Sequence, residues 1–73
     1  MSHSSKTICL DFDGVLHAYS QGWRGGTVYD DPVPGAVYAC RELAKQFHLI
    51  ICTARDNLHD VRMWLAFWEF PDM

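Results

Sequence analysis

The sequence lacks a cysteine pattern typical of disulfide frameworks or zinc sites, and positive charge is not in excess. The three cysteines, Cys9, Cys40 and Cys52, are odd in number and have no C-x-x-C spacing. They therefore predict neither a complete disulfide framework nor a recognisable zinc site. We expect reduced, mostly buried thiols in a cytoplasmic protein. The formal net charge is −3 at pH 7, which argues against a protein that coats nucleic acid.

Long apolar runs are also lacking. No stretch reaches the roughly 18 apolar residues that a membrane span needs, and no signal peptide opens the chain. Hydrophobic residues make up 49% and charged residues 21% of the 73 residues, a composition typical of a globular domain. Only residues 1–5, which are small and polar, are predicted to be disordered. Because so short a chain buries a limited core, we expect residues 1–73 to form a single incomplete domain.

Two apolar runs and two amphipathic segments indicate the fold class. Residues 7–10 and 47–52 are apolar without alternation, which predicts strands buried on both faces of a parallel sheet. Residues 35–46 and 57–68 carry apolar side chains at three-and-four spacing, which predicts helices. Strands that alternate with helices predict an α/β fold with parallel strands, interrupted by an irregular insert at residues 15–34.

Local signals predict how the insert turns and where the helices begin. Gly25 and Gly26 lie between two short runs and predict a small hairpin. Pro34 suits the first turn of the following helix. Asn57 is a good cap for the second helix.

Two carboxylates follow the first strand. Asp11 and Asp13 lie where that strand ends, and Thr53 lies where the second strand ends. The carboxyl ends of neighbouring parallel strands meet at one edge of the sheet, where ligands bind. Two close carboxylates repel each other unless a cation intervenes, and oxygen ligands of this kind suit Mg²⁺. We therefore expect these three side chains to converge on one crevice.

The segments around these residues resemble a known family. The segment DFDGV at residues 11–15, following an apolar strand, resembles the first signature of the haloacid dehalogenase superfamily of phosphohydrolases. The segment LIICT at residues 49–53 resembles the second signature. The short spacing between them is similar to the small-cap branch, which has a brief helical turn and a hairpin flap after the first strand. The resemblance covers about residues 6–70 and implies the N-terminal half of a Rossmann-like core with flanking helices.

The resemblance implies an activity and roles for matching residues. Asp11 would be the nucleophile that forms an aspartyl-phosphate. Asp13 would protonate the leaving oxygen and then deprotonate the attacking water. The Asp11 carboxylate and the Asp13 backbone carbonyl would hold Mg²⁺. The substrate would be a small phosphomonoester; nucleotides, sugar phosphates and nucleic-acid ends all stay open, the last without support from any feature of the sequence. Phosphate would be bound by Gly14, Thr53, Ala54 and Arg55.

The sequence also departs from the family pattern. The Lys or Arg of a third signature and the acidic residues of a fourth are not in these 73 residues, so the fold is expected to be truncated. Arg24 and Arg55 are then the cationic side chains nearest the site. The alternative function is a catalytically silent remnant that acts as an interaction module. Without its second neighbour, the strand at residues 7–10 would be an open edge through which chains self-associate.

Simpler interpretations of the same residues stay open. Asp13 and Gly14 are common turn residues, and Thr53 would also suit a helix cap. Arg55 is by default a surface charge. His17 is expected to be a solvated histidine rather than part of the site.

Overall fold

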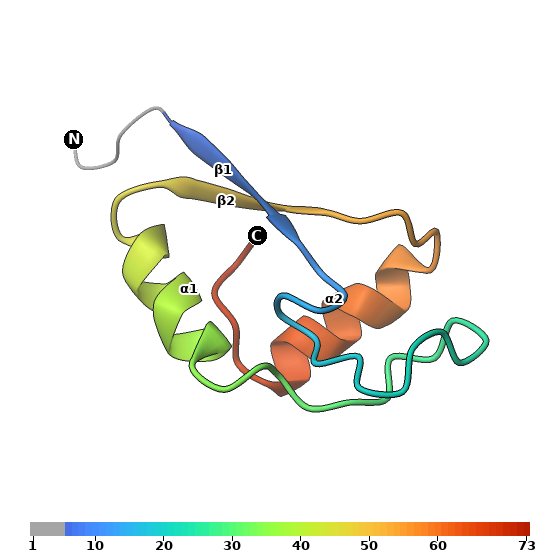
Figure 1. Ribbon diagram of the computed structural model, residues 1–73. Coiled ribbons are helices and arrows are strands. Elements are labelled where there is room, and N and C mark those ends of the chain that lie inside the picture. Colours follow the sequence, from blue (N-terminus) through green and yellow to red (C-terminus); the bar gives the residue numbers. More distant parts are fainter. Residues whose placement is uncertain (1–5) are drawn as a thin grey trace.

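The structure is a computed structural model that describes residues 6–73, so the predicted disordered end lies outside the described residues. It is a small α/β fold of two parallel strands, each followed along the chain by a helix (Figure 1). The elements are β1 (Thr7–Asp11), α1 (Ala36–Ala44), β2 (His48–Cys52) and α2 (Leu58–Phe67). The predicted order of strands and helices is confirmed.

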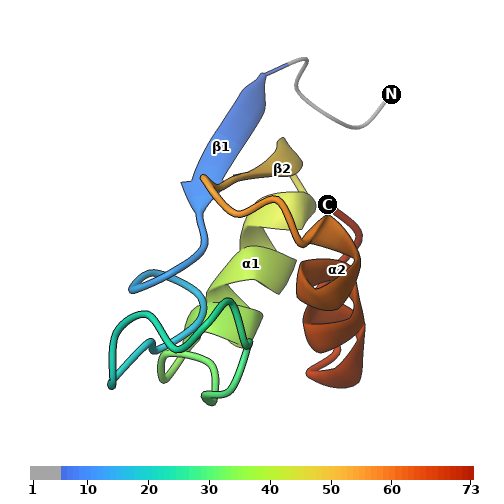
Figure 2. The ribbon, with the colours of Figure 1, turned by 90° about the vertical axis from the view of Figure 1, so that its right-hand side faces the viewer.

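The two strands pair in parallel with a single register. Thr7 lies opposite His48 at one end, and Asp11 lies opposite Cys52 at the other. Both helices lie on the same side of this two-stranded sheet, as the two ribbon views show (Figures 1 and 2). The loops that leave the carboxyl ends of β1 and β2 therefore start side by side.

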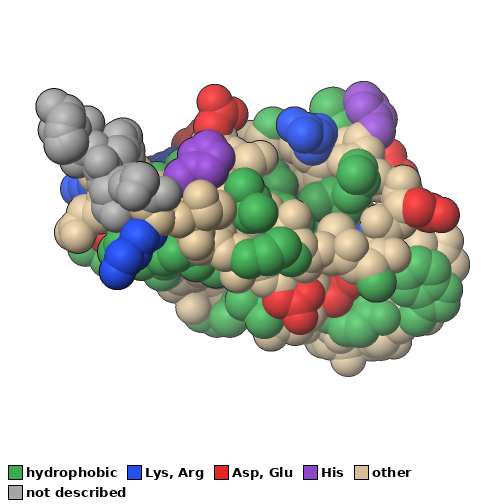
Figure 3. All heavy atoms as spheres, turned by 90° about the horizontal axis from the view of Figure 1, so that it is seen from above, with side chains coloured by type: hydrophobic (Ala, Val, Ile, Leu, Met, Phe, Trp, Pro, Cys, Tyr) green, Lys and Arg blue, Asp and Glu red, His purple; other side chains and the backbone are tan. Residues whose placement is uncertain are grey.

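Burial alternates along both strands, so the prediction of strands buried on both faces is wrong. Ile8 and Leu10 of β1 are half-buried on the helix side, whereas Thr7, Cys9 and Asp11 are exposed. The strand β2 shows the same alternation. The physical reason is that both helices cover one face, and no described element covers the other. Seen from above in Figure 3, that side of the molecule presents hydrophobic side chains among scattered charged ones.

The core lies between the sheet and the two helices. In α2, Val61 and Leu65 are buried as the apolar spacing predicts, but Leu58 is half exposed. Trp64, from the same helix, is also buried and meets the Phe12 ring edge to face at 5.2 Å. The buried hydrophobic residues are Phe12, Leu16, Ala36, Cys40, Leu49, Val61, Trp64, Leu65 and Phe70.

The insert at residues 15–34 is a hairpin-like loop without regular strands. Its two arms run side by side, because the Ala18 N–H donates to the Asp31 carbonyl at 3.0 Å and the Val33 N–H donates to the Leu16 carbonyl at 2.8 Å. At the tip, the chain turns through Gly25 and Gly26, which both have positive φ. The strand pairing predicted next to these glycines is absent from the described residues; pairing occurs only at the base of the loop. We call residues 15–34 the flap.

The starts of the helices differ from the sequence-based prediction. Pro34 lies outside α1, and Gly35 caps the helix with φ of 84°, a conformation that favours glycine. Asn57 precedes α2 as predicted, but its side chain makes no capping hydrogen bond. Its amide Nδ2 instead donates to the Gly26 carbonyl at 2.7 Å. The cap position is therefore used to fasten the tip of the flap to α2.

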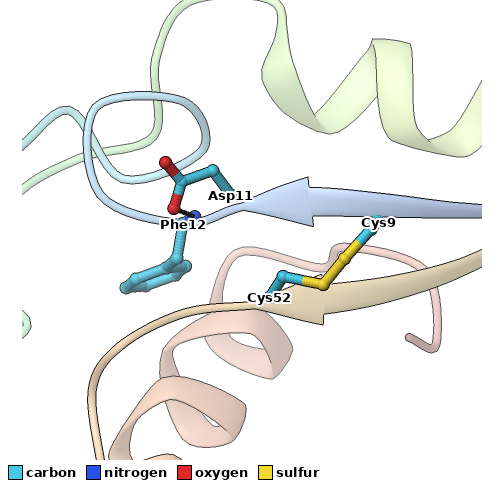
Figure 4. Close-up of a disulfide and its surroundings, with 4 residues drawn as sticks. All are labelled: Cys9, Asp11, Phe12 and Cys52. Carbon is cyan, nitrogen blue, oxygen red and sulfur yellow. Dashed lines mark hydrogen bonds between the residues drawn. A yellow bond between two sulfur atoms is a disulfide. The ribbon is translucent and has the colours of Figure 1, made fainter.

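A disulfide joins Cys9 of β1 to Cys52 of β2, with their Cα atoms 5.7 Å apart (Figure 4). Both residues are exposed on the uncovered face, because the register places them diagonally across the two strands on the same side. The expectation of three reduced, buried thiols is therefore wrong for this pair. It holds for Cys40, a buried free thiol whose pKa is raised by burial.

The prediction of a reducing compartment rested on reduced cysteines, and the disulfide removes that support. A cytoplasmic location stays a prediction. Within residues 6–73, no helix has the length and apolar character needed to cross a membrane.

Candidate functional site

An ion pair joins the loops that leave the two strands. Arg55, after β2, donates from Nε to Asp13 Oδ2 at 2.8 Å and from Nη2 to Asp13 Oδ1 at 3.0 Å. The Arg55 side chain is 2% exposed and that of Asp13 is 21% exposed. This bidentate geometry is the strong form of an arginine–carboxylate contact. Arg55 is therefore a buried partner of Asp13, and the default interpretation of it as a surface charge is wrong.

Arg55 also binds the flap. Its Nη1 donates to the Gly26 carbonyl at 2.7 Å. Its guanidinium lies 5.7 Å from the centre of the Phe12 ring and 5.2 Å from that of Trp23, within the range of a cation–π contact. One side chain thus connects the loop after β2, the loop after β1 and the tip of the flap.

His17 completes the polar network from the other side. Its Nδ1 lies 2.8 Å from Asp13 Oδ1, and its Nε2 accepts the Asp30 backbone N–H at 3.0 Å. Because Nε2 accepts, the ring proton that faces Asp13 is on Nδ1. The side chain is fully buried and stacks on the Phe12 ring at 5.3 Å. The expectation of a solvated histidine is wrong, because the flap folds over it.

The network sets the charge state of Asp13. Partial burial by itself raises the pKa of this carboxyl, but the hydrogen bonds from Arg55 and His17 and the charge of Arg55 together bring it below its usual range. Hydrogen bonding to Asp13 in turn raises the pKa of Arg55. Asp13 is therefore held as an ionised carboxylate at neutral pH.

Asp11 lies apart from this network. It is exposed, and its Oδ1 accepts the backbone N–H of Phe12 at 2.8 Å. Figure 4 shows the carboxylate turned back onto that nitrogen, in the same region as the disulfide, with the Phe12 ring pointing away from it. No hydrogen bond in the described part of the chain links Asp11 to Asp13 or Thr53. The convergence of Asp11 with Asp13 and Thr53 therefore stays a prediction.

The remaining candidate residues shape the two loops. The Thr53 hydroxyl oxygen accepts the Arg55 backbone N–H at 3.2 Å, so Thr53 closes the turn after β2 and does not cap α2. Ala54 lies exposed within that turn. Gly14 has φ of 83° and donates its N–H to the His17 carbonyl at 2.7 Å. Any side chain there would be strained by the backbone conformation, although the space beside it is open.

Arg24, the other cationic candidate, is exposed near the tip of the flap and donates from Nη1 to Gln21 Oε1. Among the described residues, its side-chain hydrogen bond is to Gln21 and not to the network around Asp13. Of the two arginines that the sequence offered, only Arg55 is brought to the first strand's loop.

The oxygen donors that could hold a metal at this edge of the sheet are Asp11, Asp13 and Thr53, and the nearby His17 imidazole is bonded to Asp13. Both carboxylate oxygens of Asp13 are engaged by Arg55 and His17, whereas Asp11 uses one oxygen for a single backbone contact. Within residues 6–73, no cluster of three or more acidic, cysteine or histidine side chains is arranged to hold a metal ion. A carboxylate, a backbone carbonyl and several waters are a donor set that Mg²⁺ accepts, and Asp11 with the Asp13 carbonyl fits that description.

A groove lies between the tip of the flap and α2, beside the Arg55 network. It has a volume of about 710 Å³ and is lined by Trp23, by residues 25–28 and by side chains at the start and along one side of α2. Trp23 and Gly26, which form one wall, are also the residues that Arg55 contacts from behind. The groove and the ion pair therefore share a wall.

The polar network shows what could and could not be found from the pattern of residues. Asp11, Asp13 and Thr53 stand out because they follow apolar strands, whereas His17 gives no signal beyond its place four residues after Asp13 on a turn.

Comparisons of the chain with models of protein families, with curated proteins and with solved structures found no match.

Proposed function

We propose that this protein is a Mg²⁺-dependent phosphohydrolase of the haloacid dehalogenase type that acts on a small phosphomonoester, and that its two strands and two helices are the N-terminal half of that Rossmann-like core. The observation that carries the proposal is the direct contact between the DFDG loop after β1 and the loop after β2, made by Asp13 and Arg55. The contact joins a carboxylate and a guanidinium at the carboxyl edge of adjacent parallel strands. Ligands bind at this edge in open α/β sheets.

The chemistry assigns a different task to each carboxylate. A carboxylate oxygen of Asp11, which is exposed, attacks phosphorus, and the bond from phosphorus to the leaving oxygen breaks. The leaving oxygen takes a proton from Asp13. In the second half, Asp13 takes a proton from water as the water oxygen attacks phosphorus, and the Asp11 carboxylate is released.

Asp13 needs a proton for the first step, and Arg55 controls whether it has one. In the structure Asp13 is ionised because Arg55 and His17 both bind it. A phosphate monoester offers Arg55 more negative oxygens in the same bidentate geometry. When Arg55 turns to the phosphate, the pKa of Asp13 rises and the carboxyl can bind the proton that it later donates.

The other candidate residues have supporting roles in this proposal. The Asp11 carboxylate and the Asp13 backbone carbonyl would hold Mg²⁺, which would supply positive charge to offset the negative charge of the nucleophile and the phosphate. The Thr53 hydroxyl would donate to a phosphoryl oxygen, next to the backbone N–H of Ala54, and Gly14 would let the chain turn closely beside the phosphate. Catalysis would then rest mainly on positioning and on neutralising phosphoryl charge.

One observation favours the alternative, a catalytically silent domain that acts as an interaction module. Both oxygens of Asp13 are already bonded, and an ionised carboxylate cannot donate a proton. If Arg55 never leaves Asp13, the ion pair is a structural fastener between the two loops and the flap. The two functions therefore differ in whether phosphate displaces Arg55.

Turnover of a generic aryl phosphate separates the two. We expect p-nitrophenyl phosphate to release phosphate only with Mg²⁺ present, and Asp11→Asn to abolish the release. Asp72→Asn, a matched change of an exposed aspartate near the end of the chain, should leave the rate unchanged. Folded wild-type protein without Mg²⁺-dependent turnover, or an active Asp11→Asn variant, would contradict the phosphohydrolase.

A further inference from the structure

Large apolar side chains are exposed in the groove between the flap and α2. Of the side chains that line it, Trp23 is 61% exposed, Met63 is 59% exposed and Phe67 is 76% exposed. These residues come from two separate segments, the flap tip and α2, and they face one space of about 710 Å³. That volume lies within the range of small-molecule sites.

The flap tip is fastened in place, so the groove is a built feature of the fold. Gly26 accepts hydrogen bonds from Asn57 Nδ2 and from Arg55 Nη1, both at 2.7 Å. Arg55 also stacks behind Trp23, so the indole ring is held from one side while it remains largely exposed. Asn57 Oδ1 has no hydrogen-bond partner among the described residues, which leaves an acceptor unused at this wall.

The charge of the lining is of one sign. The only ionisable side chains that line the groove within residues 6–73 are Asp56 and Asp60. Neither forms an ion pair in the described part of the chain. An aromatic ring presents a negative face, so Phe67 adds to the preference for a positive ligand, whereas the Trp23 ring already has the Arg55 guanidinium 5.2 Å from its centre. Anionic ligands are disfavoured by the same groups.

We propose that this groove is a binding site for a small aromatic or apolar ligand that carries a positive charge. The apolar part would lie against Trp23, Met63 and Phe67, and the cationic group would face Asp56 and Asp60. We infer this class of ligand from the negative charges of Asp56 and Asp60, which a cation complements, and from the volume of the groove. The inference does not depend on the phosphohydrolase, because none of these side chains has been given a role in it.

Three phenols of similar shape test the charge preference. Tyramine is a cation, 4-ethylphenol is neutral and 3-(4-hydroxyphenyl)propionate is an anion at pH 7. Binding to the whole chain would be followed by the indole N–H signals in nuclear magnetic resonance, without any phosphate ester. An exposed ion pair and an exposed cation–π contact are each worth a few-fold in affinity, so we expect tyramine to bind about tenfold more tightly than 4-ethylphenol. The anion should bind most weakly.

Two variants assign the preference to this groove. Asp56→Asn with Asp60→Asn should reduce the preference for tyramine over 4-ethylphenol from about tenfold to the few-fold that a cation–π contact supplies, while 4-ethylphenol affinity is unchanged. The matched control, Glu42→Gln with Asp72→Asn, makes the same change of charge at exposed positions elsewhere and should keep the tenfold preference. Trp23→Ala should weaken all three phenols.

The proposal is overturned if the three phenols bind equally, if tyramine gives no saturable shift, or if the double asparagine variant keeps the full tenfold preference for the cation. Loss of the preference in the control pair would also overturn it, because the effect would then be one of net charge. Since no turnover is measured, these outcomes are separate from the failure or success of the phosphohydrolase.

Discussion

Removal of the Arg55 side chain should cost this small protein a large part of its stability. Arg55→Met keeps the length and the apolar stem of the side chain but removes three hydrogen bonds, two to Asp13 and one to the Gly26 carbonyl. It also leaves the Asp13 carboxylate beside His17 without its cationic partner. The variant therefore breaks a buried ion pair from one side, which is the costly way to break one.

The expected loss follows from the burial of the two partners. Breaking a buried pair by removing one partner costs about 3–5 kcal/mol. Because Asp13 is 21% exposed, water can reach the stranded carboxylate, and we expect the lower end of that range, about 3 kcal/mol. A domain of 73 residues has a total stability of about 4–11 kcal/mol, so the variant should be close to unfolded at modest urea concentrations.

Urea unfolding at pH 7 of wild type, Arg55→Met, Asp13→Asn and the double variant measures this. The midpoint should fall without a change in the slope with urea, and the double-mutant cycle should give a coupling of about 2 kcal/mol between Arg55 and Asp13. Arg41→Met is the matched control, because Arg41 is an exposed arginine that bonds the Glu69 carbonyl. A loss below about 0.5 kcal/mol for Arg55→Met, as for a surface pair, would refute the reasoning.

Three further predictions follow from the same structure. The folded-state pKa of Asp13 is lowered, so the contribution of this carboxylate to stability is complete above its unfolded-state pKa and is lost as the pH falls through the folded-state pKa. In urea unfolding series at several pH values, wild type should therefore lose its stability advantage over Asp13→Asn below about pH 4. A constant difference in stability down to pH 2 would contradict the pKa shift. The disulfide closes a loop with a sequence separation of 43 residues. Replacing both cysteines, Cys9→Ser with Cys52→Ser, should therefore lower the free energy of unfolding by about 4 kcal/mol if the disulfide acts by reducing the entropy of the unfolded chain. Equal stability of the oxidised protein and the variant would count against a formed disulfide. The strand β1 has a single described neighbour, so its other edge is open to pairing with another chain. We therefore expect concentration-dependent association in sedimentation experiments, together with slow amide exchange in β1. A monomer at all concentrations would contradict association through that edge.

The order of strands and helices could be predicted from local pattern alone. Apolar residues at three-and-four spacing define a helix whatever lies elsewhere in the chain, and the segment predicted at residues 35–46 forms α1 over Ala36–Ala44. The same holds for the position of Asp11 and Asp13 at the end of β1. These features depend on residues within one or two turns of each other, so the sequence contains what is needed to infer them.

Which face of the sheet is covered could not be predicted in this way. The run at residues 7–10 is apolar throughout, and an apolar residue is found on either side of a strand. The outcome was decided by both helices packing on one face. The same packing and the strand register left Cys9 and Cys52 exposed and adjacent.

The partners of the site residues were likewise decided by tertiary structure. Asp13 and Arg55 lie 42 positions apart, and their contact requires that β1 and β2 pair in parallel so that their following loops start together. His17 is buried among rings from separate segments, those of Phe12, Tyr29 and Trp64. Sequence by itself determined the elements and the residues at their ends, since those follow from neighbours along the chain; the tertiary structure alone decided the ion pair, the disulfide and the groove, since each joins segments that only the fold brings into contact.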